Sequence, residues 1–140
     1  DAFNLKLKQK FDIVISFRFI RHLNMKERKI IYEQIRSIQK NEGLLVFDVC
    51  NDFRHKNQIK NRNIYDKLYT IKEIKKELIE NGFKIEKVIG YLHGSEVLFR
   101  LNIFPKLLFW IIFFLDKYVF RNLPLKKFAY LWIIVAKKQN

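Results

Sequence analysis

Polar side chains that could do chemistry cluster where two apolar runs of the chain end. The first run spans residues 11–16, and its end is marked by Ser16, Phe17, Arg18, Arg21 and His22. The second run begins at Leu44, and its end is marked by Asp48, Cys50, Asn51 and Asp52. Histidine titrates near neutral pH and could take a proton from a substrate hydroxyl. The planar arginine side chain could hold a carboxylate or a phosphate. These residue types predict a site for an ionisable or anionic small molecule.

Each of these candidates also has a structural interpretation, which stays open at this point. His22 could pack against the next helix and cap a backbone group, and this is the commoner role of a histidine there. Arg18 and Arg21 could be surface residues, and Ser16 with Phe17 could form a turn that ends the strand. The polar residues after the second run could cap the loop that follows.

A strand–helix–strand unit is predicted to position these residues. Residues 11–16 have the composition of a buried strand, and residues 44–50 of a second one. Between them, Asn24 with Glu27 predicts a capping box, and one apolar helix face follows, formed by Ile30, Ile31, Ile35 and Ile38. Residues 41–43 are predicted to be a turn. Ligands of open parallel sheets bind beyond the carboxyl ends of the strands, which is where the candidates lie.

The rest of the chain predicts one more helix and two more strands. Residues 51–66 are polar and predict a loop over the same sheet edge. Thr70 with Glu73 predicts a second capping box on a helix over 70–81, whose apolar stripe consists of Ile71, Ile74, Leu78 and Ile79. A strand near the sheet edge is expected over 83–92, and a central strand over 130–136. Tyr65 and Tyr69, just before the second helix, could close over a substrate or simply pack.

Composition narrows the class of protein. The 140 residues carry 28 Lys and Arg against 14 Asp and Glu, a formal charge of +14, and 49% of them are hydrophobic. The basic residues are scattered, which favours solvated helix faces over a nucleic-acid site. Cys50 is the only cysteine, which excludes an internal disulfide and fits a reducing cytoplasm. Cys50, His55 and His93 do not have the spacing of metal ligands, so no metal site is expected.

The order of these pieces resembles the C-terminal two-thirds of a class I S-adenosylmethionine-dependent methyltransferase of the small-molecule type. The resemblance rests on Asp1-Ala2 ahead of Phe11-Asp12, on His22-Leu23 after the first strand, on Gly43 before the second, on Asn81-Gly82-Phe83, and on Ala136-Lys137. It implies a Rossmann-like doubly wound α/β sheet that closes with an antiparallel strand. It also implies S-adenosyl-L-methionine as cofactor and methyl transfer to a small-molecule acceptor.

The resemblance assigns roles to individual residues. Asp1 and Ala2 would lie near the adenine, and Ser16 and Phe17 would flank the methionine end of the cofactor. His22 would be the candidate base. Acceptor contacts would come from Arg18, Arg21, Asp48, Asn51, Tyr65 and Tyr69. The family's glycine-rich loop and ribose-binding acidic residue have no counterpart among these 140 residues. The chain is therefore expected to be part of a longer one, with residues 11–16 as an exposed apolar edge and little cofactor affinity of its own.

An apolar segment before the last strand predicts a helical insertion over 96–128. Its centre, Leu107–Leu115, is nine uninterrupted apolar residues, too few for the roughly 20 that span a membrane. A buried helix, a lid over an acceptor pocket and a helix lying on a membrane surface all remain open. A non-catalytic basic module of the same fold, binding a membrane surface or RNA, is the alternative function.

Overall fold

The computed structural model describes residues 1–55, 66–91, 110–111, 114–115, 118 and 129–139. The strands are β1 (Phe11–Ser16), β2 (Gln39–Asn51), β3 (Leu68–Tyr69), β4 (Phe83–Tyr91) and β5 (Leu131–Lys138). The helices are the 3₁₀ turn η1 (Ile20–His22), α1 (Met25–Ile38), α2 (Asp52–His55) and α3 (Ile71–Glu80).

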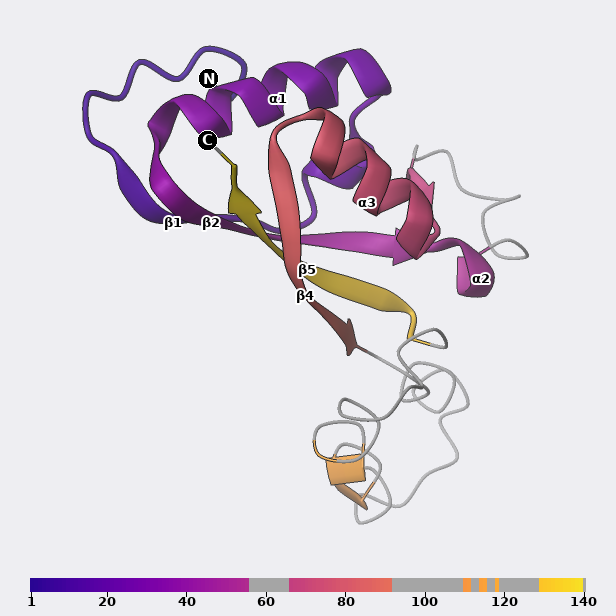
Figure 1. Ribbon diagram of the computed structural model, residues 1–140. Helices are drawn as coiled ribbons and strands as arrows, with labels where there is room; N and C mark the ends of the chain where they lie inside the picture. The colour runs from indigo at the N-terminus through magenta and orange to yellow at the C-terminus, as the bar shows by residue number, and fades with distance from the viewer. Residues whose placement is uncertain (56–65, 92–109, 112–113, 116–117, 119–128, 140) are drawn as a thin grey trace.

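The strands form one mixed sheet in the order β1-β2-β5-β4, with β3 added beside β2 (Figure 1). β1 and β2 are parallel and are joined through α1, whereas β5 is antiparallel to both β2 and β4. The predicted α/β sheet with a final antiparallel strand is confirmed. The central position of the last strand and the edge position of residues 83–91 are confirmed as well.

Both predicted capping boxes are present. The Asn24 side chain accepts from the backbone N–H of Glu27, whose carboxylate accepts from the N–H of Asn24, and Thr70 and Glu73 repeat the arrangement at α3. α3 ends at Glu80, and Gly82, just after the cap residue Asn81, has a φ of +76°, the left-handed conformation that favours glycine. The apolar stripes are narrower than predicted, because Ile30 and Ile79 are 42% and 52% exposed.

Strand register shows which side chains share a face of the sheet. One row of paired residues across the four strands consists of Val14, Leu45, Ala136 and Ile85. The next row on the same face consists of Ser16, Phe47, Ile134 and Val88. α1 and α3 lie together on one side of the sheet (Figure 1). The central positions of these rows are fully buried: Leu45, Phe47, Ile134 and Ala136. They belong to the same core cluster as two residues of α1, Ile31 and Ile35, and two of α3, Ile74 and Leu78. The core therefore lies between these helices and one face of the sheet.

The opposite face of the sheet is apolar and much less covered. Ile15, Val46 and Val135 are partners in one of its rows, and Ile13 pairs with Leu44 in the next. Ile13 and Ile15 are 53% and 63% exposed. The prediction of a strand over 11–16 is confirmed, as is its exposed apolar edge, but the prediction that it is buried is wrong. The reason is that β1 has a neighbour on one side only and α1 and α3 cover only one of its faces.

Residues 41–43 are not a separate turn but lie inside β2, which begins at Gln39. Glu42 has a φ of +62°, and the pairing with β1 shifts between Phe11 and Ile13. At Gly43 a Cβ atom would lie 3.0 Å from the carbonyl oxygen of Lys40 and 3.3 Å from that of Asp12. The segment is therefore an irregularity in β2 that needs glycine for close backbone packing.

Much of the predicted loop over 51–66 and of the insertion over 96–128 lies outside the described residues. Asp52–His55 of that loop form α2. Four described residues of the insertion are helical: Trp110, Ile111, Phe114 and Leu115. Three of them are strongly exposed, Trp110 at 65%, Ile111 at 46% and Phe114 at 58%. Among the described residues, no helix has the length and hydropathy needed to cross a membrane.

Candidate functional site

Charged side chains from three segments meet at the carboxyl ends of β1 and β2. The guanidinium of Arg21, in η1, lies 3.1 Å from the carboxylate of Asp48 and 3.4 Å from that of Asp66. His22 Nδ1 lies 3.0 Å from Asp66 Oδ1, and Arg21 Nη1 lies 3.3 Å from Cys50 Sγ. We call Arg21, His22, Asp48, Cys50 and Asp66 the edge cluster. It forms where the sequence predicted the site, and it unites three of the predicted residues: Arg21, His22 and Asp48.

The geometry of the edge cluster fixes the orientation of His22. Nδ1 lies near a carboxylate and Nε2 accepts from Arg21, an arrangement that favours the neutral tautomer with its proton on Nδ1. Nε2 accepts a long hydrogen bond from Arg21 Nε at 3.4 Å, and the side chain is 32% exposed. A partly exposed imidazole oriented by a carboxylate can accept a proton from a bound molecule.

Asp48 organises the end of the neighbouring strand. Its Oδ1 accepts a 2.5 Å hydrogen bond from the backbone N–H of Arg18, which has a φ of +54°. Its Oδ2 pairs with Arg21. The two carboxylates of the cluster therefore surround the single guanidinium of Arg21, which has only 11% of its side-chain surface exposed. The side chain of Arg18 is exposed at the same edge.

Cys50 is a thiol in this environment. Burial, reinforced by the nearby carboxylates of Asp66 and Asp48 and opposed by Arg21, raises the pKa of Cys50 from 9.0 to about 11. Only 1% of the residue is exposed. A neutral, buried thiol is a poor nucleophile and a poor metal ligand, so Cys50 serves as a packing residue of the cluster.

Asn51 and Tyr69, predicted acceptor contacts, have structural partners instead. Asn51 is 1% exposed; its Nδ2 donates to the carbonyl of Ala129 at 2.7 Å, and its Oδ1 accepts from the N–H of Phe53 at 3.1 Å. Tyr69 is fully buried and donates its hydroxyl to Glu77. Tyr69 is buried in the core cluster beside Ile74 and Leu78 of α3, and Asn51 is held at the end of β2 by these backbone contacts.

The remaining predicted residues lie outside the edge cluster. Ser16 is half-buried at the end of β1, and Phe17 is 52% exposed beside it. The Asp1 carboxylate accepts from the N–H of Phe3 at 3.0 Å, and Ala2 packs against the core. Tyr65 lies outside the described residues.

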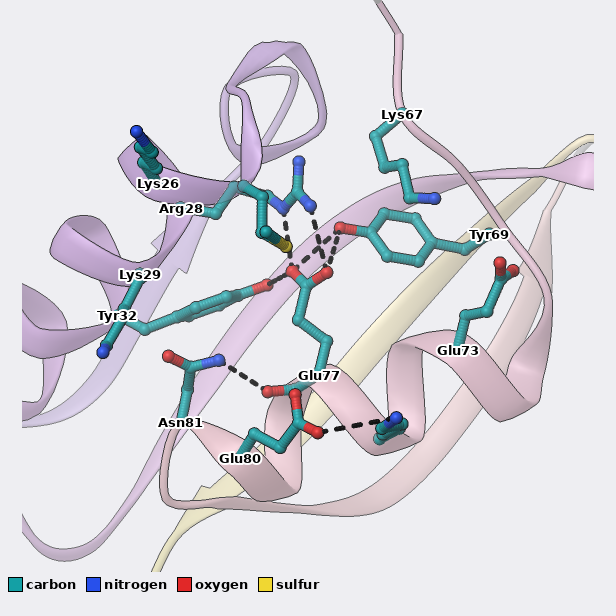
Figure 2. A pocket seen from close by; sticks show the side chains of 12 residues that line it. Lys26, Arg28, Lys29, Tyr32, Lys67, Tyr69, Glu73, Glu77, Glu80 and Asn81 are labelled. Carbon is teal, nitrogen blue, oxygen red and sulfur yellow. Dashed lines mark hydrogen bonds and ion pairs between the residues drawn. The ribbon is translucent and has the colours of Figure 1, made fainter.

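A second ionic cluster joins α1 to α3 in a groove (Figure 2). Glu77 accepts hydrogen bonds from Arg28 Nε at 2.8 Å, Arg28 Nη2 at 3.1 Å, Tyr32 at 3.1 Å and Tyr69 at 2.9 Å. We call these four residues the interhelical cluster. Burial, and then the negative charge of Glu77, raises the pKa of Tyr32 well above 10.0, so its hydroxyl stays a donor.

The sequence analysis did not single out the interhelical cluster or Asp66. A signal for the first exists: Arg28 stands three and four positions before the buried Ile31 and Tyr32, and Glu77 is three after Ile74, so both charges occur on core-facing stripes. Asp66 offers no comparable signal, because it ends a polar, basic segment without an apolar periodicity that would indicate which way its side chain points. Within the described part of the chain, no group of three metal-binding side chains is present.

The same fold occurs in solved methyltransferases. A S-adenosylmethionine-dependent methyltransferase from Clostridium acetobutylicum superposes with a TM-score of 0.64 and 12% identity, over 100% of this chain and 63% of that one. A possible histamine N-methyltransferase from Thermotoga maritima superposes with a TM-score of 0.64 and 14% identity, over 99% of this chain and 61% of that one. The magnesium protoporphyrin IX methyltransferase of Synechocystis was solved with S-adenosylhomocysteine. It superposes with a TM-score of 0.56 and 15% identity, over 99% of this chain and 49% of that one.

No protein-family model and no curated protein sequence matches the chain. The structural superpositions show that the chain has the fold of the class I S-adenosylmethionine-dependent methyltransferases, as predicted. It spans less than two thirds of the length of the structures named above.

Proposed function

We propose that this chain is the acceptor-side part of a methyltransferase that uses S-adenosyl-L-methionine and acts on a small molecule. The observation that carries the proposal is the sheet itself, in which the antiparallel β5 lies between β2 and β4, with a polar cluster at the carboxyl ends of β1 and β2. A sheet of this form at identities of 9–15% supports the fold, and the cluster supports chemistry at that edge.

The residues of this chain fit the cofactor only in part. Ser16 and Phe17 end β1 at the edge where a ligand of an open sheet would lie. The sequence contains no Gly-x-Gly turn that would let the backbone approach the cofactor, and of the described glycines Gly43 is packed within β2 and Gly82 follows the end of α3. The residues that grip the ribose would therefore come from further polypeptide.

The uncovered sheet face supports the need for that polypeptide. Parallel strands are normally covered on both faces, and Ile13 and Ile15 remain more than half exposed in these 140 residues. The shorter span relative to the solved structures points the same way.

In the proposed reaction the edge cluster lies beside the acceptor and takes up its proton. S-adenosyl-L-methionine supplies an electrophilic methyl group on a sulfonium sulfur. The acceptor atom forms a bond to that methyl carbon as the carbon–sulfur bond breaks, and sulfur keeps the bonding electron pair. His22 Nε2 takes the proton that the acceptor loses, while Asp66 holds Nδ1 and stabilises the resulting imidazolium. Arg18, exposed beside the cluster, is better placed than the doubly paired Arg21 to hold an anionic group of the acceptor.

Calorimetric titration with S-adenosylhomocysteine tests the proposal. The product of the complete reading frame that contains this chain should bind it, and the 140-residue chain should bind it much more weakly. Absence of binding to the complete product, or a reading frame that adds no further strand and glycine-rich turn, would overturn the proposal.

The alternative function is a non-catalytic basic module that binds a membrane surface or RNA. The observation that favours it is the formal charge of +14, together with exposed Trp110 and Phe114 in the apolar segment. Flotation with anionic vesicles, without any S-adenosylhomocysteine binding by the complete product, would favour this alternative over the enzyme.

A further inference from the structure

The groove between α1 and α3 has the size of a small-molecule site. Its volume is about 600 Å³, within the roughly 300–1,000 Å³ of typical ligand pockets. The interhelical cluster forms its floor, and lysines from both sides surround it: Lys26 and Lys29 from α1, Lys67 from the segment before β3, and Lys76 from α3 (Figure 2). The groove is separate from the edge cluster, since the two have no lining residue in common.

The charges that line the groove do not balance. Five cationic side chains and three carboxylates line it, which leaves an excess of two positive charges. Each carboxylate already has a partner within the protein. Glu73 accepts from the N–H and the hydroxyl of Thr70 at 2.7 and 2.8 Å, Glu77 binds Arg28, and Glu80 lies 3.8 Å from Lys76.

Three lysines are left facing the groove. Among the described residues, no carboxylate lies within 4.0 Å of the ammonium groups of Lys26, Lys29 or Lys67. Lys67 is also held in place, with its Nζ 5.3 Å from the centre of the Tyr69 ring. Figure 2 shows Lys67 across the groove from Lys26 and Lys29, so a bound anion would be approached from both sides.

The floor determines which chemistry is left for a ligand. Arg28 is already bound to Glu77 and to the carbonyl of Leu23, 2.6 Å from its Nη1, and the Tyr32 and Tyr69 hydroxyls also donate to Glu77. A ligand would therefore bind through the lysine ammonium groups, which act as point charges and suit phosphate oxygens. We propose that this groove binds the phosphate group of a phosphorylated small molecule or of a lipid headgroup.

The proposal goes beyond the proposed function and can be tested without the cofactor. Inorganic phosphate and glycerol phosphate are titrated into the 140-residue chain, with sodium chloride keeping the ionic strength constant, and binding is measured by amide chemical shifts. Shifts are expected at residues 25–29, 67–69 and 73–77. The triple variant Lys26→Gln/Lys29→Gln/Lys67→Gln should raise the Kd at least about tenfold.

A matched variant separates a site from general attraction. Lys72→Gln/Lys75→Gln/Lys84→Gln removes the same charge from exposed positions that do not line the groove. Its Kd should stay within about twofold of the original, since distant charges are screened at this ionic strength. Equal weakening by both triple variants, or no binding by the unaltered chain, would overturn the proposal.

The source of the phosphate is decided by a second measurement. Co-sedimentation with phosphatidylglycerol vesicles that is lost in the groove variant and absent with phosphatidylcholine would identify a lipid headgroup. Binding of glycerol phosphate without vesicle binding would identify a soluble molecule. A failure of this proposal leaves the methyltransferase proposal untouched, because it involves neither S-adenosylhomocysteine nor the edge cluster.

Discussion

Arg28 and Glu77, which are 49 residues apart in the sequence, form a two-pronged ion pair that ties α1 to α3. The Nε–Oε1 distance is 2.8 Å and the Nη2–Oε2 distance is 3.1 Å. Side-chain exposures of 4% and 17% place the pair largely out of water. Such a pair is costly to break, because the remaining partner keeps a buried charge without compensation.

Replacing Glu77 tests this relationship. Glu77→Gln should lower the free energy of unfolding by about 3 kcal/mol, since it leaves the buried guanidinium of Arg28 without its counter-charge. Urea unfolding followed by circular dichroism measures the change. Glu80→Gln, on the exposed side of the same helix, should stay within about 0.5 kcal/mol of the original chain. Similar losses in the two variants would mean that the ion pair has no special role.

The two faces of the sheet should respond differently to truncation. Leu45→Ala, at a fully buried position on the helix-covered face, should cost about 2–5 kcal/mol of unfolding free energy. Ile15→Ala, on the uncovered face with 63% exposure, should cost less than about 1 kcal/mol and reduce self-association of the chain. Urea unfolding and light scattering check the two expectations. A large loss of stability in the Ile15 variant would contradict the uncovered face.

Cys50 should react with alkylating reagents only at high pH. Because burial raises its pKa from 9.0 to about 11, the rate with iodoacetamide in the folded chain should rise near pH 11, and that of the urea-unfolded chain near pH 9. Between these pH values the unfolded chain releases the proton first. The contribution of Cys50 to stability is therefore complete below pH 9 and is lost as the pH rises to 11. A Cys50→Ala variant provides the blank, and a folded-state midpoint near 9 would contradict the prediction.

Asp66 should determine which nitrogen of His22 carries the proton. In the 140-residue chain, nitrogen chemical shifts of the imidazole should show Nδ1–H as the main neutral form. Asp66→Asn should reduce that preference, whereas Asp52→Asn should leave it unchanged. Under the proposed function, the Asp66 variant of the complete reading-frame product should lower kcat about 10- to 100-fold, in line with the loss of oriented acid–base catalysis. An unchanged tautomer in the Asp66 variant would contradict the role of this carboxylate.

Local sequence was sufficient for the two long helices and for the positions of strands β1, β4 and β5. Asn24 with Glu27 and Thr70 with Glu73 specify both helix starts through contacts within four residues. The apolar composition of residues 130–136 on both faces predicted a central strand, which the structure has at Leu131–Lys138. These features could be predicted because the interactions that produce them join residues close together in the sequence.

The sequence alone also predicted where the edge cluster lies, but not all of its members. It placed Arg21, His22 and Asp48 at one sheet edge, because the carboxyl ends of parallel strands coincide there. Only the tertiary structure brought Asp66 to His22, turned Tyr69 into the interior and left Ile13 and Ile15 exposed. Those outcomes depend on how β3 adds to β2 and on which face of the sheet receives the helices. Contacts between segments distant in sequence leave no periodic pattern in the chain, so three-dimensional packing alone decided them.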